Sequence, residues 1–480
     1  MAGFVLAPIV FASLWLAPLD LAVPAHRLAA ILGTVVVLWI TEAIPMAMTA
    51  FLGVAAAVAF GVAPAAKAFA PFADPLIFVF IGTFMLARAI FFHGLDRRFA
   101  FAMLALPGVG ARPGRVLGVF ALIGCMISMW ISNTATVAML YPIALSLLAV
   151  LESHGRGSER YAAALLLSAS FSASVGGLGT PVGTPPNLIG IGFIRRELGI
   201  DLPFFSWMML GVPVSLSLVG VAILSLRRGT PTAPDPGLAA SIAAEHRTIG
   251  PWTAGQRNAA IAFGVTVALW VLPGVIALVA GQEHPLYKQL QGAIPESVVA
   301  LLGATLLFVL PTDWRRLEFT LPWEEAVQID WWIVFLYGGG IALGTLAFET
   351  GLAEAMGRSL TSLLGVQSAF GLLLLSTVLA TVLSETTSNT ASANMVVPVV
   401  IAFARSAGID PLLPAIGATM GASLGFMLPV STPCNAIVYG SGRIPLPVMM
   451  RQGIVLDVIG IVVVVAVVWT LGPIVLGSRP

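Results

Sequence analysis

Long apolar stretches, separated by short polar segments, follow one another along the whole sequence. About 20 apolar residues suffice to cross the hydrocarbon core of a bilayer as a helix. The stretches that we expect to cross in this way are residues 4–19, 26–43, 46–63, 75–94, 161–196, 207–226, 258–280, 297–311, 330–356, 412–440 and 453–477. The pattern therefore predicts an all-α polytopic membrane protein with about 11 transmembrane helices.

Two further apolar stretches, residues 116–150 and 366–404, are long enough to enter the membrane and to leave it again on the same side. Each carries the polar tripeptide Ser-Asn-Thr near its middle, at residues 132–134 and 388–390. We therefore expect two re-entrant helical hairpins that turn at these tripeptides. Since neither hairpin would cross, the odd number of spans places the two chain ends on opposite sides of the membrane.

A second polar break follows each hairpin inside otherwise apolar sequence. It reads Gly-Thr-Pro-Pro-Asn at residues 183–187 and Ser-Thr-Pro-Cys-Asn at residues 431–435. Proline interrupts a helix and frees backbone carbonyls, and irregular backbone at membrane depth is tolerated where it lines a cavity. A single break is explained equally well by a kink with hydroxyls that bond back to the preceding turn. Two matched pairs of breaks favour a binding site for a small solute.

The matched features indicate an internal repeat. Ser388 lies 256 positions after Ser132 (388 − 132 = 256), and residues 332–352 resemble residues 75–95 at nearly the same spacing. Five predicted crossings separate the starts of the two units, and an odd number turns the second unit upside down. Inverted repeats with discontinuous helices that meet at the midplane are typical of secondary transporters.

The composition agrees with lipid as the solvent of this chain. Hydrophobic residues make up 58% and charged residues only 9%, whereas soluble domains carry about 25% charged residues. The net charge of +1 and the lack of a basic run argue against a nucleic-acid partner. The stretch at residues 4–19 has no basic segment before it, so we expect a first span there and not a removable signal peptide.

The distribution of positive charge predicts the orientation. With the N-terminus inside, the cytoplasmic loops hold 14 Lys and Arg residues and the outer loops hold 8, including Arg479. Positive residues accumulate on the cytoplasmic side, so the count predicts a cytoplasmic N-terminus in the cell inner (plasma) membrane. The polar loop at about residues 227–257, which contains Pro231, is expected to link the two halves.

The polar breaks carry neutral oxygen and nitrogen groups. Ser128 precedes Ser132 by one helical turn, and Ser384 precedes Ser388 in the same way, so each pair of hydroxyls shares a helix face. Hydroxyls, side-chain amides and freed carbonyls suit a small cation such as Na⁺, whereas amide and hydroxyl donors at helix N-termini suit a carboxylate. No Lys or Arg lies in the four segments, so a co-bound cation is the natural partner of a bound dianion.

Isolated charged residues have simpler interpretations. Arg88 lies inside a predicted span, where a structural ion pair or snorkelling is favoured over contact with a substrate. Glu385 stands beside the second tripeptide and is either a cation or proton ligand or a cap of the hairpin on the water side, which we favour. Cys125 and Cys434 are expected to be small buried residues and not a disulfide pair.

These motifs resemble a known family. The two Ser-Asn-Thr tips, Leu-Trp-Ile-Thr-Glu-Ala-Ile-Pro at residues 38–45, and Ala-Ser-Leu-Gly-Phe-Met-Leu-Pro-Val-Ser-Thr-Pro-Cys-Asn-Ala-Ile-Val at residues 422–438 are similar to the divalent anion/sodium symporter family. This INDY-type group carries dicarboxylates, citrate or sulfate. The likeness covers nearly the whole chain. Cys434 stands where a second proline is usual, and Ser384 stands where a threonine is expected.

The resemblance implies a homodimer in which a scaffold domain makes the dimer contact and a transport domain slides as an elevator. It assigns scaffold helices to residues 1–115, the first hairpin and broken helix to 116–205, a linker and further scaffold helices to 206–356, and the second hairpin, broken helix and last span to 357–480. The two segments that contain hairpins would form the transport domain.

The resemblance also implies the ligands. One Na⁺ site would lie near Ser128, Ser132, Asn133 and Gly183. A second Na⁺ site would lie near Ser384, Thr387, Ser388, Asn389 and Ser431. The substrate carboxylates would meet Asn133, Thr134, Thr184, Asn389, Thr390, Thr432 and Pro433. Neither departure from the family pattern removes a type of ligand, so Na⁺ coupling is favoured.

The sequence thus predicts a secondary transporter that couples two or more Na⁺ ions to uptake of a di- or tricarboxylate, above all a C4-dicarboxylate such as succinate, without an organic cofactor. Sodium-independent exchange of dicarboxylates and transport of sulfate or citrate stay open as alternatives. An intramembrane hydrolase would need a serine next to a base, and no histidine lies near either tip. Closed, mirror-related hairpins favour alternating access over a channel.

Overall fold

A computed structural model of the chain describes residues 1–228, 230, 233–281, 283–366 and 368–476. Three predictions fall partly outside the described residues: the linker at residue 231, the end of the last span at residue 477, and the outer charge at residue 479. The described chain is helical apart from loops and one small antiparallel hairpin of β1 (Pro311–Asp313) and β2 (Glu318–Phe319). The helical content confirms the all-α class.

Seven elements recur in the same order in two parts of the chain. The first unit consists of α5 (Pro75–Phe92), α6 (Leu95–Leu104), α7 (Pro113–Ser128), α8 (Asn133–Ser153), α9 (Glu159–Gly176), α10 (Pro185–Phe193) and α11 (Phe204–Leu226). The second unit consists of α17 (Trp331–Glu349), α18 (Leu352–Leu364), α19 (Ala369–Thr386), α20 (Asn389–Ser406), α21 (Leu412–Gly421), α22 (Pro433–Tyr439) and α23 (Leu446–Leu476). This order extends the repeat beyond the tripeptides.

The other elements precede and separate the units. They are α1 (Ala2–Leu16), α2 (Val23–Thr41), α3 (Met46–Ala59), α4 (Ala65–Phe69), the short 3₁₀ turn η1 (Ala70–Ala73), α12 (Pro236–Thr248), α13 (Ala254–Ala280), α14 (Pro285–Ala293), α15 (Glu296–Val309) and α16 (Trp323–Ala326). Among the described residues, nine helical segments are long and apolar enough to cross a membrane, and five shorter apolar helices accompany them. The chain is therefore a polytopic membrane protein.

The two hairpins turn where the tripeptides predict. Ser132 is the N-cap of α8 and its Oγ accepts the N–H of Ala135 at 3.4 Å. Ser388 is the N-cap of α20 and its Oγ accepts the N–H of Ala391 at 3.2 Å. A capping serine satisfies one of the N–H groups that a helix start leaves free. The same residue type therefore fixes the turn and the start of the second helix in both hairpins.

Both predicted broken helices are interrupted by non-helical backbone. α9 ends at Gly176, the 3₁₀ turn η2 (Gly177–Gly179) follows, and α10 begins at Pro185 and continues into the π-helical turn η3 (Ile194–Leu198). In the second unit α21 ends at Gly421 and α22 begins at Pro433. Proline fits the first helical position because its missing N–H has no partner there in any case.

Two boundaries differ from the apolar pattern. The predicted span at residues 330–356 contains the end of α17 and the start of α18, because Gly351 adopts a φ of 80° that ends one helix and redirects the chain. The predicted linker contains α12, which Asp235 caps by accepting the N–H of Gly237 at 2.9 Å. The expected domain boundaries after residues 115, 205 and 356 fall just inside α7, α11 and α18.

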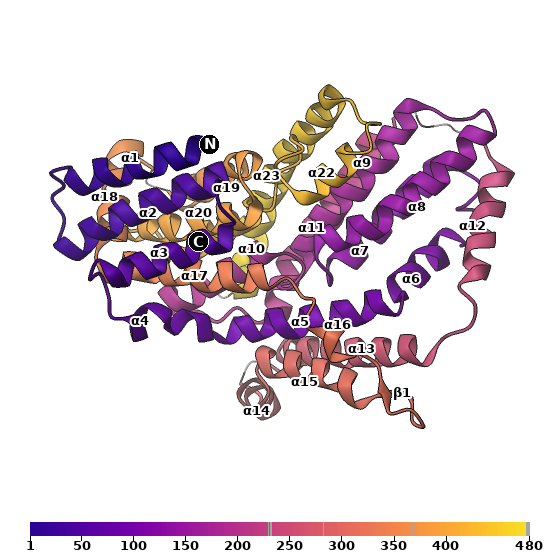
Figure 1. Cartoon of the computed structure of the whole chain (residues 1–480), viewed down its shortest axis with the longest axis horizontal. Coiled ribbons are helices and arrows are strands. Elements are labelled where there is room, and N and C mark those ends of the chain that lie inside the picture. Colours follow the sequence, from indigo (N-terminus) through magenta and orange to yellow (C-terminus); the bar gives the residue numbers. More distant parts are fainter. Residues whose placement is uncertain (229, 231–232, 282, 367, 477–480) are drawn as a thin grey trace.

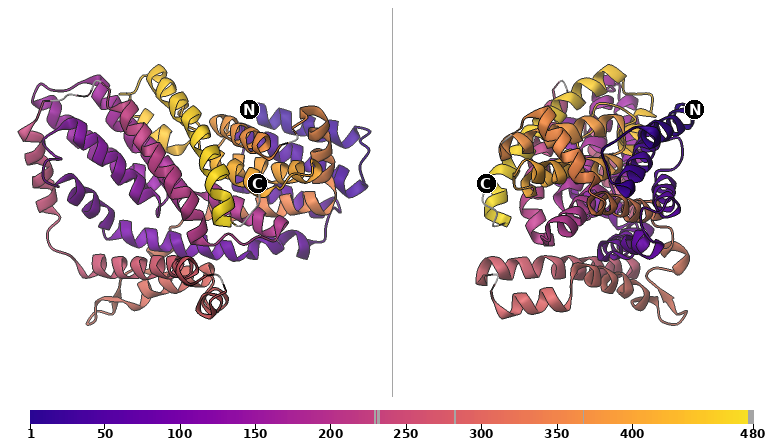
Figure 2. Two further views of the ribbon diagram at one scale, coloured as in Figure 1. Left: turned by 180° about the vertical axis from the view of Figure 1, so that it is seen from behind. Right: turned by 90° about the vertical axis from the view of Figure 1, so that its left-hand side faces the viewer.

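The two units pack reciprocally. α10 of the first unit packs on α20 and α21, and α22 of the second unit packs on α8 and α9, while α11 runs along α23. In Figure 1 the helices α1–α3 lie with α17, α18 and α20 at one end of the molecule, and α6, α7, α8 and α12 lie at the other. The helices α13, α14 and α15 form a separate layer beyond α5 (Figures 1 and 2). The broken helices therefore lie between the two hairpins.

Candidate functional site

The first cluster of predicted ligands lies where the α7–α8 hairpin meets the break between α9 and α10. The side-chain amide of Asn133, with its NH₂ group turned toward acceptors, donates to the carbonyls of Gly183 at 3.3 Å and Ala173 at 3.1 Å and to Ser128 Oγ at 2.7 Å. Gly183 has no room for a side chain, since a Cβ there would lie 2.6 Å from the carbonyl oxygen of Gly177. An amide, a hydroxyl and two backbone carbonyls thus converge in one place.

The second cluster repeats this arrangement at the α19–α20 hairpin. Ser384 Oγ lies 2.7 Å from Asn389 Oδ1 and 2.7 Å from the carbonyl oxygen of Ala422. Ser431 takes the place of the first unit's glycine, and its hydroxyl lies 2.7 Å from the carboxylate of Glu385 and 3.1 Å from the carbonyl oxygen of the same residue. The second cluster therefore has one more hydroxyl than the first, and a carboxylate beside it.

A pair of buried asparagines, Asn187 and Asn435, braces the two breaks. Asn187 Nδ2 donates to the carbonyls of Gly177 and Thr180 at 2.8 Å each. Asn435 Nδ2 donates to the carbonyls of Gly425 at 3.3 Å and Leu428 at 3.0 Å. The donor and both acceptors lie 248 positions after their counterparts in the first unit (435 − 187 = 248). Their matching positions in the sequence are the signal that could have indicated this role, which the predicted ligand set does not include.

Contacts between the units bring the first tip toward the second broken helix. Ser170 Oγ on α9 donates to Asn435 Oδ1 on α22 at 2.6 Å. The thiol of Cys434 lies beside the hydroxyls of Thr134, at the first tip, and of Ser174 on α9. Cys125 and Cys434 are both buried and free, as predicted. Thr134 of the first unit therefore lies beside the start of α22 in the second unit.

Some predicted ligands use their hydroxyls in backbone hydrogen bonds. Thr387 Oγ1 donates back to the carbonyl of Leu383 at 2.9 Å, and Thr432 Oγ1 accepts the N–H of Asn435 at 3.1 Å. Thr184 stands at the equivalent N-cap of α10, but its side chain makes no capping bond. A hydroxyl that already caps a helix meets an ion only through its remaining lone pair. Thr184 is thus better placed for a ligand than Thr432.

The remaining predicted substrate residues lie at helix starts. Asn133 and Asn389 are the half-buried first residues of α8 and α20, and Thr390 follows as a buried residue. Thr134 and Pro433 are exposed. The N-terminus of a long helix presents free N–H groups and a positive dipole end, and both favour an anion. The geometry can therefore hold a carboxylate at either tip.

Among the described residues, ion pairs lie outside the predicted ligand set, and Glu385 is the charged side chain that hydrogen-bonds a predicted ligand, Ser431. Arg88 makes an ion pair with Glu325, and its guanidinium also donates to Gln328 Oε1 at 2.8 Å, which confirms the predicted structural role. Among the residues that the structure describes, no ion pair includes a member of the predicted ligand set.

The predicted water-side cap at Glu385 is wrong. Its side chain is only 4% exposed, and its carboxylate accepts the N–H groups of Met427 at 2.9 Å and Leu428 at 3.3 Å and the hydroxyl of Ser431 at 2.7 Å. These partners lie more than 40 positions later in the chain, so only the folded structure brings them together. Glu385 therefore fastens the second tip to the segment between α21 and α22.

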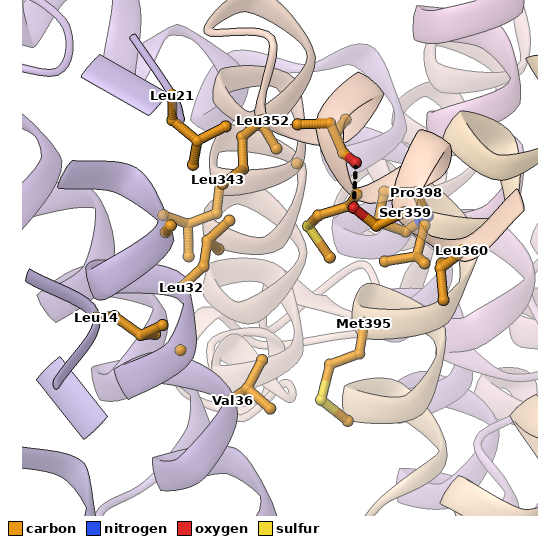
Figure 3. Close-up of a pocket in the computed structure, with 18 of the residues that line it drawn as sticks. Leu14, Leu21, Leu32, Val36, Leu343, Leu352, Ser359, Leu360, Met395 and Pro398 are labelled. Atoms are coloured by element: carbon orange, nitrogen blue, oxygen red, sulfur yellow. Dashed lines mark hydrogen bonds between the residues drawn. The ribbon is translucent and has the colours of Figure 1, made fainter. Parts of the chain in front are cut away.

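A large cavity of about 900 Å³ lies outside both clusters. Figure 3 shows its apolar lining, with Leu14 of α1 and Leu32 of α2 facing Leu352 of α18 and Met395 of α20. Most of the lining is apolar, with Arg358, Ser359 and Asn394 among the few polar residues, so the cavity offers a dianion fewer donors than the two clusters do. The cavity instead separates the N-terminal helices from the second hairpin.

Comparisons with known proteins agree on the kind of protein. A family model described as the sodium:sulfate symporter transmembrane region matches residues 1–477. The sodium-dependent dicarboxylate transporter SdcS of Staphylococcus aureus strain USA300 is 30% identical over 493 residues, which cover 99% of this chain and 92% of the relative. SdcS proteins of the strains bovine RF122 / ET3-1 and MSSA476 match with the same identity and coverage.

A solved structure shares the fold. The YdaH transporter of Alcanivorax borkumensis matches with a TM-score of 0.58, over 85% of this chain and 87% of that chain, at 16% sequence identity. This likeness is evidence for the architecture alone.

Proposed function

The chain belongs to the family of the sodium:sulfate symporter transmembrane region, and we propose that it couples a Na⁺ gradient to the import of a C4-dicarboxylate such as succinate. The membership confirms the predicted resemblance, and with it a transporter rather than an enzyme. The choice of a dicarboxylate rests on the SdcS relatives, whose name states both the substrate class and the dependence on sodium.

The observation that carries the proposal is the equivalence of the two clusters. In each unit a serine hydroxyl lies 2.7 Å from the asparagine amide of the hairpin tip, at Ser128 and Asn133 and again at Ser384 and Asn389. Neutral oxygens in such a cluster suit a cation that has shed water, because its charge needs several oxygen ligands. A hydrogen-bond network that only stabilises one hairpin would not need to occur at the equivalent place in the other unit.

We assign two Na⁺ ions to these clusters. The first would be held by Ser128, Ser132, Asn133 and Gly183. The second would be held by Ser384, Thr387, Ser388, Asn389 and Ser431. Because the hydroxyls of Thr387 and of the two capping serines already bond backbone groups, these residues would contribute through a remaining lone pair. Each proposed site combines ligands from a hairpin tip with a ligand from the break of the same unit, so it would be complete only while these two segments remain in contact.

The anion would lie between the two tips. Its carboxylates would meet donors at Asn133, Thr134, Thr184, Asn389, Thr390, Thr432 and Pro433, where the starts of α8 and α20 add free N–H groups. Two Na⁺ ions would offset the two negative charges of succinate, in agreement with the lack of arginine and lysine in the sequence of the four polar segments. Each further co-transported charge would draw about 2.3 kcal/mol from every 100 mV of membrane potential.

The proposed mechanism is an elevator in which the two hairpins and the two broken helices move as one body against the remaining helices. The reciprocal packing of α10 and α22 supports such a body, and it also supports an inverted repeat. The largely apolar cavity between α1–α2 and α18–α20 supports sliding, because no ion pair spans it among the described residues. We further propose a homodimer held by the scaffold helices, with a cytoplasmic N-terminus in the inner membrane.

Uptake into proteoliposomes tests this function. Labelled succinate should accumulate with an inward Na⁺ gradient and should not accumulate when choline or K⁺ replaces Na⁺. Equal uptake without Na⁺, together with faster uptake into vesicles preloaded with unlabelled succinate, would instead establish sodium-independent exchange. Competition by unlabelled citrate or sulfate in the same assay identifies the preferred anion.

A further inference from the structure

Two buried carboxylates meet beside the second cluster. Glu385 at the end of α19 is 4% exposed, and Asp457 in the middle of α23 is 5% exposed. The side chain of Glu385 lies directly against that of Asp457. An ionised carboxylate only accepts hydrogen bonds, so neither group can satisfy the other. Unless a proton or a cation binds between them, the pair would place two negative charges in contact in the interior of a membrane protein.

The backbone of α23 fixes Asp457 in this position. Gly453 and Gly460 lie on the same helix face as Asp457, one turn before it and one turn after it. A Cβ on Gly453 would lie 2.4 Å from the carbonyl oxygen of Phe426, and one on Gly460 would lie 3.1 Å from the side chain of Leu424. Both glycines let α23 approach the segment between α21 and α22 closely, so the aspartate cannot turn away from it.

The two carboxylates differ in how they are satisfied. Glu385 accepts the N–H groups of Met427 and Leu428 and the hydroxyl of Ser431. Within the part of the chain that the structure describes, neither carboxylate oxygen of Asp457 has a hydrogen-bond partner, although the backbone of Phe426 lies nearby. Among the described residues, no arginine, lysine or histidine makes an ion pair with either group. Charge this deep in a membrane protein requires a partner.

The first unit has no such pair. Met129 occupies the position equivalent to Glu385 (385 − 129 = 256). Gly211 approaches the carbonyl of Leu178 as Gly453 approaches that of Phe426, and four positions after Gly211 stands Ser215, which donates to the carbonyl of Val175 at 2.8 Å. In the first unit, neutral residues therefore occupy the positions of both carboxylates. The carboxylate pair is an addition in the second unit and not a requirement of the fold.

We propose that a third cation, Na⁺, binds between Glu385 and Asp457. The proposal rests on the proposed function and extends it from two ions to three. A single shared proton joins one oxygen of each carboxylate, whereas a cation can contact several oxygens of the pair. Oxygen atoms of carboxylates are favoured ligands of hard cations. Because Ser431 bonds Glu385, this ion would also strengthen the second cluster by fixing the glutamate.

Binding of Na⁺ to the purified protein tests the site without transport. The melting temperature is measured while NaCl replaces choline chloride at constant ionic strength, since an ion that binds the folded state raises it. Asp457→Asn should melt higher than wild type without Na⁺, because the repulsion is gone, and should show a smaller rise with Na⁺. Asp457→Ser, which copies the first unit, should behave in the same way if the asparagine variant folds poorly.

Asp96→Asn is the matched control, because Asp96 is also a buried aspartate, 6% exposed, but lies on α6 away from the pair. Its Na⁺-dependent rise should equal that of wild type. An unchanged rise in Asp457→Asn would overturn the proposal. So would a difference between Asp457→Asn and wild type that follows pH and not Na⁺, because a shared proton would then hold the pair.

Simultaneous flux of labelled Na⁺ and labelled succinate separates this proposal from the proposed function. Wild type should move one more Na⁺ per succinate than Asp457→Asn. If both proteins require Na⁺ and move the same number of ions, the third site is wrong and symport stands. If wild-type uptake ignores Na⁺ altogether, symport itself is wrong.

Discussion

The first and second units share a hydrogen-bonded framework and differ in the charge that they bury. In both units a serine hydroxyl lies 2.7 Å from the asparagine of the hairpin tip, and a second asparagine donates to two carbonyls of the break. Where the first unit has Met129, Gly183 and Ser215, the second has Glu385, Ser431 and Asp457. The repeat thus preserves the framework, while the second half adds oxygen ligands and negative charge.

This difference teaches that equivalent folds need not give equal ion sites. Neutral hydroxyls and amides repay only part of the cost of removing water from Na⁺, whereas a nearby carboxylate attracts the ion strongly in a medium of low dielectric constant. We therefore expect the second unit to bind Na⁺ more tightly than the first. Substitutions at equivalent positions in the two units can break or sharpen this comparison.

The largest effect is expected where the units are most alike. Asn133→Ala and Asn389→Ala should each reduce succinate uptake on the order of 100-fold or more, because each amide would serve both an ion and the anion. The measurement is uptake per amount of protein that elutes as a monodisperse species. Near wild-type uptake by either variant would remove the corresponding cluster from the site.

Asn258→Ala is a suitable control for these variants. Asn258 lies on α13, outside both units, and its amide donates to the carbonyl of Pro311 and to Thr320 Oγ1 at 2.9 Å each. The substitution removes a comparable amide and should leave uptake per folded protein unchanged.

A smaller and unequal effect is expected at Gly177 and Gly425, whose carbonyls accept the side-chain amides of Asn187 and Asn435. A Cβ on Gly177 would lie 2.4 Å from the side-chain amide of Asn133 and 3.0 Å from the side chain of Thr184, whereas one on Gly425 would lie 3.2 Å from Ser384 and 3.4 Å from Ser431. Overpacking of about 1–3 kcal/mol at the first position should therefore reduce uptake by Gly177→Ala roughly tenfold or more.

Gly425→Ala serves as the comparison, since its neighbours need to shift by only a few tenths of an ångström. Its uptake should stay within about a factor of three of wild type, as expected for a cost below about 1 kcal/mol. Equal losses in the two variants would show that the second unit is packed as tightly around its cluster as the first.

The smallest effect is expected from the one hydroxyl that the second unit adds. Ser431→Gly removes the hydrogen bond to Glu385, so half-maximal uptake should need roughly fivefold more Na⁺, as expected for a loss of about 1 kcal/mol. The reverse change, Gly183→Ser, should lower the melting temperature, because its Cβ would meet backbone at 2.6 and 2.9 Å. Unchanged Na⁺ dependence in Ser431→Gly would remove this hydroxyl from the second site.

Much of this framework is local and follows from the sequence. Ser132 and Ser388 fix the hairpin tips because a serine N-cap acts within three residues. Pro185 and Pro433 begin the second half of each broken helix because the fixed φ and missing N–H of proline suit the first helical position. The equal spacing of the two tripeptides is enough to indicate the repeat. The predicted structural role of Arg88 is likewise confirmed, because charge inside a span calls for a partner.

The features that could not be predicted depend on contacts between distant segments. The polar sequence neighbours of Glu385 favour a position on the water side, yet its partners come from the segment before α22 and from α23. The bracing roles of Asn187 and Asn435 likewise depend on carbonyls that face inward only once the break has folded. The helix α12 is not evident from the apolar pattern, because its sequence is too polar to stand out from a linker.

The most direct test of the central claim is the ratio of labelled Na⁺ to labelled succinate that enters proteoliposomes together during the first seconds of uptake. Symport through two equivalent clusters predicts at least two Na⁺ ions per succinate, and the carboxylate pair raises the expected ratio to three. Succinate entry at an undiminished rate with no accompanying Na⁺ would contradict the account.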